Sequence, residues 1–193
     1  MMPGIGTGPY VTAVEFLAHP AGARASELVR GAVHVMTPAS GAYGVVAGTI
    51  FAALNAFVER RQLGMCFPDN TGFQLPGLDD TVRSPDVAFV RAERLPADGI
   101  GSGWMTVTPD LVVEILSPSE TTSELEEKVR DYRTAGTRLF WIVDPLGRTV
   151  SIRGDAQSRE HTAHEGEILD GADVLPGFVM PVEHLFARLA KPI

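Results

Sequence analysis

Residues 111–116 read Leu-Val-Val-Glu-Ile-Leu, and this stretch decides the fold. An almost wholly apolar run is typical of a central strand that is buried on both faces of its sheet. Residues 121–135 then carry apolar side chains at helical spacing, with Gly136 as the expected C-cap, and a second apolar run, Leu139-Phe-Trp-Ile-Val143, follows. This order of strand, helix and strand predicts an α/β or α+β domain, with a mixed β-sheet flanked by helices.

The segments on either side of this centre predict shorter elements. Residues 1–10 are expected to be a flexible N-terminus, and residues 11–193 a single domain. The expected elements are a helix at 12–19, a hairpin that turns at Arg30-Gly31, a helix at 42–61 that stops at Gly64, a strand at 82–90, an edge strand at 149–153 and a helix at 181–189.

The composition is that of a soluble globular protein and not of a disordered one. Of the 193 residues, 45% are hydrophobic and 21% are charged. Cys66 is the only cysteine, which excludes an internal disulfide and a cysteine-based zinc site and makes a reducing cytoplasm the expected location. The N-terminus lacks a secretory signal, and no apolar run approaches the ~20 residues that span a bilayer, so no membrane association is expected.

The net charge of −8 argues against a nucleic-acid partner, because phosphate binding is usually driven by a basic patch. No segment of the chain is basic. A bound divalent metal would offset part of the acidity locally. Since only two of the sixteen basic residues are lysine, the others are arginine, which binds phosphate through a planar fork.

Glu114 is the first candidate for chemistry, because it interrupts the apolar run of a buried strand. An ionised carboxylate is costly to bury without a partner. A salt bridge to an arginine, or a strand end that is open to water, would explain it without function. A metal ion is the alternative, since it suits carboxylate oxygens and removes that cost.

Asp86 stands in Ser-Pro-Asp-Val-Ala-Phe-Val, residues 84–90. An Asp after Pro is a common turn residue, which is the structural explanation. Because an extended segment follows, Asp86 is also expected near the start of a strand, where it shares a face with Ser84 and Ala88. A neighbour as small as Ala88 leaves room for an ion.

Lys128 lies on the predicted helix, within the apolar stripe formed by Leu125, Val129 and Tyr132. Snorkelling along the edge of the stripe would explain this position. The alternative is that Lys128 points into a site formed by the preceding strand, because a short loop makes strand and helix packed neighbours. Two carboxylates and a lysine are the minimal equipment for metal-dependent attack on a phosphodiester.

These residues resemble the PD-(D/E)XK nuclease superfamily and, more closely, the bacterial restriction endonuclease-like family known as Uma2. The likeness runs from Glu27-Leu-Val-Arg-Gly31 through Leu175-Pro-Gly-Phe178. Its central motifs are Ser84-Pro-Asp-Val-Ala-Phe, Pro109-Asp-Leu-Val-Val-Glu-Ile-Leu-Ser-Pro118, Glu127-Lys128, Tyr132, Gly136 and Leu139-Phe-Trp-Ile-Val-Asp-Pro145.

The resemblance implies a restriction-endonuclease-like αβββαβ core and a divalent metal, usually Mg²⁺, with Mn²⁺ as a substitute. It implies that Asp86 and Glu114 hold the metal. Our own hypothesis adds the Ile115 carbonyl as a further ligand. The commonest superfamily pattern has its lysine two residues after the acid, where this chain has Leu116; in this family the following helix supplies it, which matches Lys128. The chain departs from its relatives at Ala32, where a Glu is frequent, and at Tyr43, where a His is frequent.

The resulting hypothesis is a Mg²⁺-dependent endonuclease that hydrolyses DNA, with Asp86, Glu114 and Lys128 as its catalytic residues. The metal would polarise the scissile phosphate and lower the pKa of a bound water. A homodimer is compatible with cutting both strands. Two alternatives stay open: a catalytically degenerate module that binds or regulates, and a hydrolase of smaller phosphate esters.

Overall fold

The computed structural model describes residues 9–19, 25–36, 38–117, 120–154 and 160–189. Most of the expected flexible N-terminus therefore lies outside the described residues. The helices are α1 (Ala13–Ala18), α2 (Gly41–Arg61), the 3-10 turn η1 (Ala92–Arg94), α3 (Thr122–Ala135) and α4 (Val182–Phe186). The strands are β1 (Ser26–Val29), β2 (Ala32–Val35), β3 (Gly64–Pro68), β4 (Phe73–Gln74), β5 (Val82–Arg83), β6 (Val87–Arg91), β7 (Leu111–Ile115), β8 (Leu139–Asp144), β9 (Thr149–Arg153), β10 (His161–His164), β11 (Ile168–Asp170) and β12 (Val179–Pro181).

The larger sheet is mixed and has the strand order β10-β9-β8-β7-β6-β3. Strand β7 lies in its interior, parallel to β8 and antiparallel to β6. Helix α3 connects the two parallel strands, as a crossover connection must. The predicted fold class is confirmed, with the sequence 111–116 at its centre.

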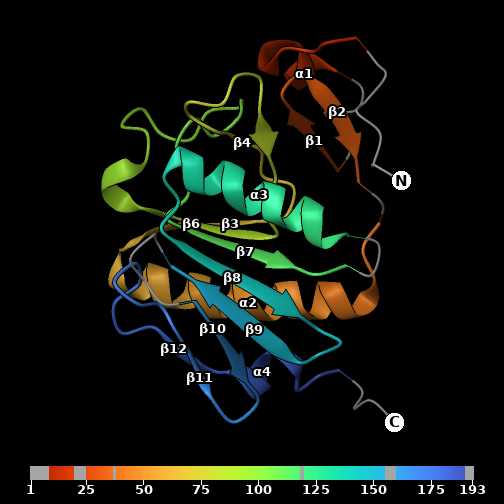
Figure 1. Ribbon diagram of the computed structural model, residues 1–193. Coiled ribbons are helices and arrows are strands. Elements are labelled where there is room, and N and C mark those ends of the chain that lie inside the picture. Colours follow the sequence, from red (N-terminus) through yellow and green to blue (C-terminus); the bar gives the residue numbers. More distant parts are fainter. Residues whose placement is uncertain (1–8, 20–24, 37, 118–119, 155–159, 190–193) are drawn as a thin grey trace.

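Helices cover both faces of this sheet (Figure 1). Side chains alternate along β7, so Leu111, Val113 and Ile115 enter the core shared with α2, whereas Val112 enters the core shared with α3. By the same alternation Glu114 belongs to the α3 face, which is the face on which Lys128 is found. Figure 1 also shows the hairpin of β1 and β2 beyond α3, so α3 lies between this hairpin and the larger sheet.

The expected single strand at residues 82–90 is in fact two strands in two different sheets. β5 belongs to a smaller sheet with the order β2-β1-β5-β4, and β6 belongs to the larger one. Pro85 stands between them and has no N–H to donate to a ladder, so pairing stops and the chain changes sheets there. This break leaves Asp86 immediately before β6.

Helix α2 differs from expectation at its end and in its composition. Gln62, with φ of 55°, is the left-handed C-cap in place of Gly64, which has already entered β3. By length and composition alone the helix could cross a membrane, contrary to the expectation that no segment could. One face of α2 is nevertheless buried in the core against the larger sheet through Val46, Ile50 and Leu54.

Two smaller expectations are wrong at the C-terminal side. β9 is an interior strand because β10 pairs with its outer edge. The last helix, α4, covers only Val182–Phe186 of the expected range 181–189. Cys66, the only cysteine of the chain, is buried in β3.

Candidate active site

Asp86 and Glu114 face each other across two neighbouring strands. The register between β6 and β7 pairs Val87 with Val113 and Ala88 with Val112. Continued by one residue, this antiparallel register places Asp86, which immediately precedes β6, opposite Glu114 of β7. The sequence predicted two acids on adjacent strands, and the register brings the two positions together.

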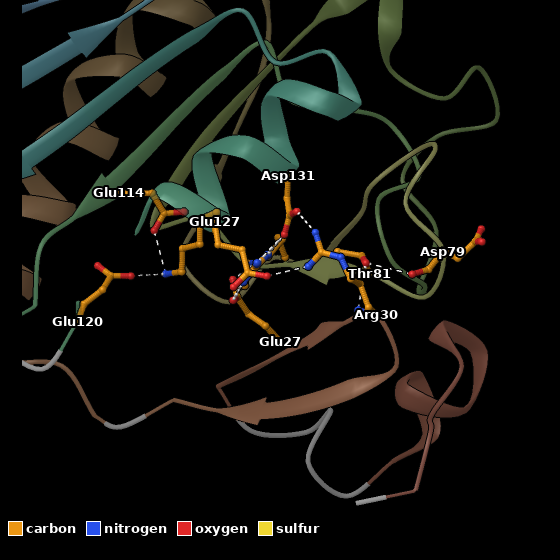
Figure 2. A network of polar contacts seen from close by, with 11 residues as sticks. Glu27, Arg30, Asp79, Thr81, Glu114, Glu120, Glu127 and Asp131 are labelled. Carbon is orange, nitrogen blue, oxygen red and sulfur yellow. Dashed lines mark hydrogen bonds and ion pairs between the residues drawn. The ribbon is translucent and has the colours of Figure 1, made fainter. Parts of the chain in front are cut away.

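Glu114 is almost completely buried, with 2% of its surface exposed. Its Oε2 accepts a hydrogen bond from Lys128 Nζ at 3.2 Å, while its Oε1 has no hydrogen-bond partner. Lys128 Nζ also lies 3.0 Å from Glu120 Oε1, on the loop that leads into α3. Figure 2 shows Glu114 and Glu120 with dashed lines from both to the ammonium group between them.

Lys128 reaches this position because α3 packs its apolar stripe on the sheet. Leu125, Val129 and Tyr132 are buried in the core between α3 and the sheet, and Lys128 lies among them along the helix. A capping box at Thr121 and Glu124 fixes the first turn of the helix directly after the strand that carries Glu114. The side chain of Lys128 is only 15% exposed, so it points into the site and not into bulk solvent.

Asp86 is held by two further groups that come from different elements. The hydroxyl of Tyr43, in the first turn of α2, donates to its Oδ1. The backbone N–H of Ile115 donates to its Oδ2 at 2.5 Å. The structure thus brings Ile115, expected as a ligand through its carbonyl, against Asp86 through its N–H.

Burial sets the electrostatics of the two acids. It raises the pKa of Asp86 to about 7, although hydrogen bonds from Tyr43 and Ile115 and the charge of Lys128 act in the opposite direction. Burial also raises the pKa of Glu114 well above its ordinary value, against the lowering effect of Lys128. Strongly perturbed pKa values of neighbouring acids are concentrated at functional sites.

The pKa of Lys128 moves upward, so the ammonium stays charged. Burial by itself lowers the pKa of this group, but the carboxylates of Glu114, Glu27, Glu120 and Asp86 together outweigh burial. A permanently protonated lysine can donate hydrogen bonds and offset negative charge, but it cannot accept a proton.

A second set of charges continues from the site to the N-terminal hairpin. Arg83 on β5 is 5% exposed and contacts Glu27 at 2.8 Å and Asp131 of α3 at 2.5 Å. Arg30, in the turn between β1 and β2, contacts Asp131 at 2.5 Å and Glu127 at 2.8 Å. Figure 2 shows this row running from Glu120 and Glu114 past Glu127 to Asp131 and Arg30.

Sequence reasoning did not single out Glu27, Arg83 or Glu120. Glu27 and Arg83 each stand beside buried apolar residues in short strands, and that position was a readable signal of a buried ion pair. Glu120 gave no such signal, because it precedes a helix N-cap, where acids are common. Asp69 was also missed; its charge acts on both Asp86 and Tyr43.

The donor set fits a hydrated divalent cation better than a fully enclosed one. No group of three or more His, Cys, Asp or Glu side chains among the described residues is arranged to hold a metal. Mg²⁺ does not need one, because it usually keeps several waters and binds through one or two carboxylates and substrate phosphate. Glu114 Oε1 is an unpartnered buried oxygen of the kind such an ion would contact.

Charge balance gives an independent reason for a cation. The connected groups around the site comprise six carboxylates and three cations, a formal excess of three negative charges. The carboxylates are those of Glu27, Asp86, Glu114, Glu120, Glu127 and Asp131, and the cations are Arg30, Arg83 and Lys128. Asp86 and Glu114, whose pKa values burial raises, are the members of this set that a bound cation, or a proton, would neutralise.

Comparison with known proteins agrees with this fold. The family model Uma2, described as "Putative restriction endonuclease", matches residues 13–183. A crystal structure described as that of "a putative nuclease belonging to DUF820" from Anabaena variabilis is similar, with a TM-score of 0.80 and 20% sequence identity over 92% of this chain and 98% of that chain. At that identity the likeness shows the fold alone. No curated protein matches the chain.

Proposed function

The chain belongs to the Uma2 family, whose description is "Putative restriction endonuclease". We propose that it is a metal-dependent endonuclease that hydrolyses DNA phosphodiester bonds. The observation that carries the proposal is Glu114, a buried strand carboxylate with one unpartnered oxygen, opposite Asp86 and in contact with Lys128. We take these three residues as catalytic.

Asp86 and Glu114 would hold Mg²⁺ or Mn²⁺ between them, with the Ile115 carbonyl as a third protein ligand. When bound, the cation supplies Lewis-acid activation of the scissile phosphate and of the attacking water. The two carboxylates fix the site near the ends of two interior strands, β6 and β7. Burial of Glu114 lowers the local dielectric, which strengthens its electrostatic contact with Lys128 and with a bound cation.

Lys128 would act on the phosphate or on the attacking water as a hydrogen-bond donor. The neighbouring carboxylates raise its pKa, which favours the charged ammonium as a donor over a neutral amine as a general base. Glu114 accepts a hydrogen bond from one of its three N–H donors, and Glu120 forms an ion pair with it. A remaining N–H would stabilise the negative charge that grows on the phosphoryl oxygens as the bond breaks.

Nicking of supercoiled plasmid with Mg²⁺ or Mn²⁺ tests the function. We expect the wild type to nick only with the divalent cation, and Lys128→Ala to lose at least ~100-fold in rate, comparable to the loss of an oxyanion donor. Arg130→Ala is the matched control, because Arg130 is an exposed cation on the same helix. Equal nicking by both variants would contradict the role of Lys128.

Isothermal titration with Mn²⁺ tests the metal site separately. The wild type is expected to bind, whereas Asp86→Ala and Glu114→Ala are expected to bind at least ~10-fold more weakly, the loss that follows removal of supporting groups at metal sites. Equal affinity in all three proteins would rule out this pair of carboxylates as ligands.

The second candidate is a nuclease-fold module without catalysis. Two observations favour it: both oxygens of Asp86 already accept hydrogen bonds, and the chain carries a net charge of −8. Salt-sensitive retention of DNA without any nicking would support this module over the enzyme. A cytoplasmic homodimer is part of the main proposal, because cleaving both strands needs two symmetry-related sites, and sedimentation measures the oligomeric state.

A further inference from the structure

Asp86 receives little support from its own strand. It lies between Pro85 and the first residue of β6, at the point where the chain leaves one sheet for another. Its two hydrogen bonds therefore do the orienting: Ile115 N–H on Oδ2 and the Tyr43 hydroxyl on Oδ1. One donor belongs to the backbone of the strand that carries Glu114, and only the other is a side chain.

Tyr43 reaches Asp86 from the face of the sheet opposite to α3. It occupies the N3 position of α2, where Ser40 caps the helix by accepting a hydrogen bond from the Tyr43 N–H at 3.2 Å. Its ring packs at the margin of the core between α2 and the sheet. The helix cap thus fixes the backbone of Tyr43 and the apolar contacts fix its ring, so the hydroxyl is held beside the carboxylate.

Without the hydrogen bond from Tyr43, electrostatic repulsion would favour a different orientation of the Asp86 carboxylate. Glu114 lies opposite it, and the charges of Glu114 and Asp69 both act on this region of the site. Like charges placed directly across two strands repel one another. A neutral donor that pulls on Oδ1 keeps the group in place while leaving the second lone pairs of both oxygens free.

We propose that Tyr43 is a positioning residue, whose hydroxyl orients the Asp86 carboxylate toward Glu114 for binding of a divalent cation. This inference rests on the proposed function. The hydroxyl supplies the outer hydrogen bond that ligating carboxylates commonly have, and it contributes no ligand of its own. Burial raises the pKa of Tyr43, so the phenol remains a donor at any working pH.

Titration of the whole protein with Mn²⁺ tests the inference through affinity, independently of catalysis. Tyr43→Phe keeps the ring and removes only the hydroxyl. We expect it to bind Mn²⁺ at least ~10-fold more weakly than the wild type, which is the usual effect of losing such a hydrogen bond. Tyr10→Phe is the matched control, because Tyr10 also donates to an aspartate at 2.7 Å, but that aspartate is Asp80, which is not a residue of the proposed metal site.

Nicking assays at varied Mn²⁺ concentration give the second readout. A positioning role predicts that Tyr43→Phe needs ~10-fold more Mn²⁺ for half-maximal rate, and that its kcat at saturating Mn²⁺ stays within about threefold of the wild type. A loss of kcat that saturating Mn²⁺ does not restore would overturn positioning in favour of direct participation in the reaction.

The outcomes separate the inference from the function beneath it. Mn²⁺ affinities of wild type and Tyr43→Phe that agree within twofold overturn the role of Tyr43 and leave the metal site standing. Equal losses in Tyr43→Phe and Tyr10→Phe overturn it as well. A wild type that binds no Mn²⁺ overturns the proposed metal site and this inference with it.

Discussion

Asp86 carries a destabilising charge at alkaline pH. Burial raises its pKa to about 7 from 3.8, so the folded chain binds this proton more tightly than the unfolded chain does. The stability that this proton supplies is complete below the unfolded pKa and is lost as the pH rises through about 7. The ionised form of Asp86 therefore lowers the stability of the metal-free protein, and a bound cation would offset this cost.

Replacing Asp86 by Asn should stabilise the metal-free protein at pH 8. Asn cannot ionise, so we expect Asp86→Asn to unfold with a free energy ~1–2 kcal/mol higher than that of the wild type, with a smaller difference at pH 5. Urea denaturation in EDTA at both pH values measures this. If the wild type were more stable than Asp86→Asn at pH 8, the destabilising effect assigned to the buried Asp86 charge would be wrong.

The sequence located individual catalytic candidates where a residue type conflicted with its surroundings. Glu114 in an apolar strand and Lys128 in an apolar stripe are such conflicts, and the structure brings the two side chains together. Tyr43 stands out only as a departure from the frequent His of the family, and an aromatic residue near the start of an apolar helix presents no conflict of this kind. Its contact with Asp86 depends on where α2 crosses the end of β6, which local patterns do not specify.

At the scale of elements, Arg83 ties the smaller sheet to α3. It lies on β5 and bonds Glu27 of β1 and Asp131 of α3, and all three side chains are buried. Removing one partner from a buried ion pair leaves an uncompensated charge, which costs more than the pair itself contributes.

Arg83→Met should therefore lower the free energy of unfolding by about 3–5 kcal/mol, the cost of stranding buried charges. The control is Arg138→Met, which breaks an ion pair with Asp173, a side chain that is 71% exposed. Exposed pairs contribute less than about 1 kcal/mol. Urea denaturation compares the variants, and similar losses in both would show that burial does not govern this contact.

Elements with regular patterns were predicted well, and those that end by irregular means were not. The α3 helix and the strands on either side of it follow from hydrophobic spacing and the Gly136 cap. The division of residues 82–90 into β5 and β6 depends on which sheet each half pairs with. Gln62 as a left-handed cap was missed because glycine is the usual residue at such a position.

At the scale of the molecule, the negative charge of −8 must be reconciled with the proposed DNA substrate. Because the site itself contains an excess of carboxylates, we expect DNA affinity to depend on the divalent cation, with at least ~10-fold weaker binding in EDTA than in Mg²⁺ at fixed salt. Fluorescence anisotropy with a labelled duplex and the Lys128→Ala variant measures binding without cleavage. Identical affinity in EDTA and Mg²⁺ would contradict a cation-bridged complex.

The burial of Cys66 makes the chain suitable for site-directed spin labelling. It is the only cysteine, and burial raises the pKa of its thiol to about 12. Maleimides and methanethiosulfonates should therefore not react with it in the native protein, because the thiolate is the reactive form. A cysteine introduced at Val35, which is 61% exposed on the hairpin, would then take up a nitroxide alone. Dipolar spectroscopy between that nitroxide and paramagnetic Mn²⁺ would locate the cation within the fold.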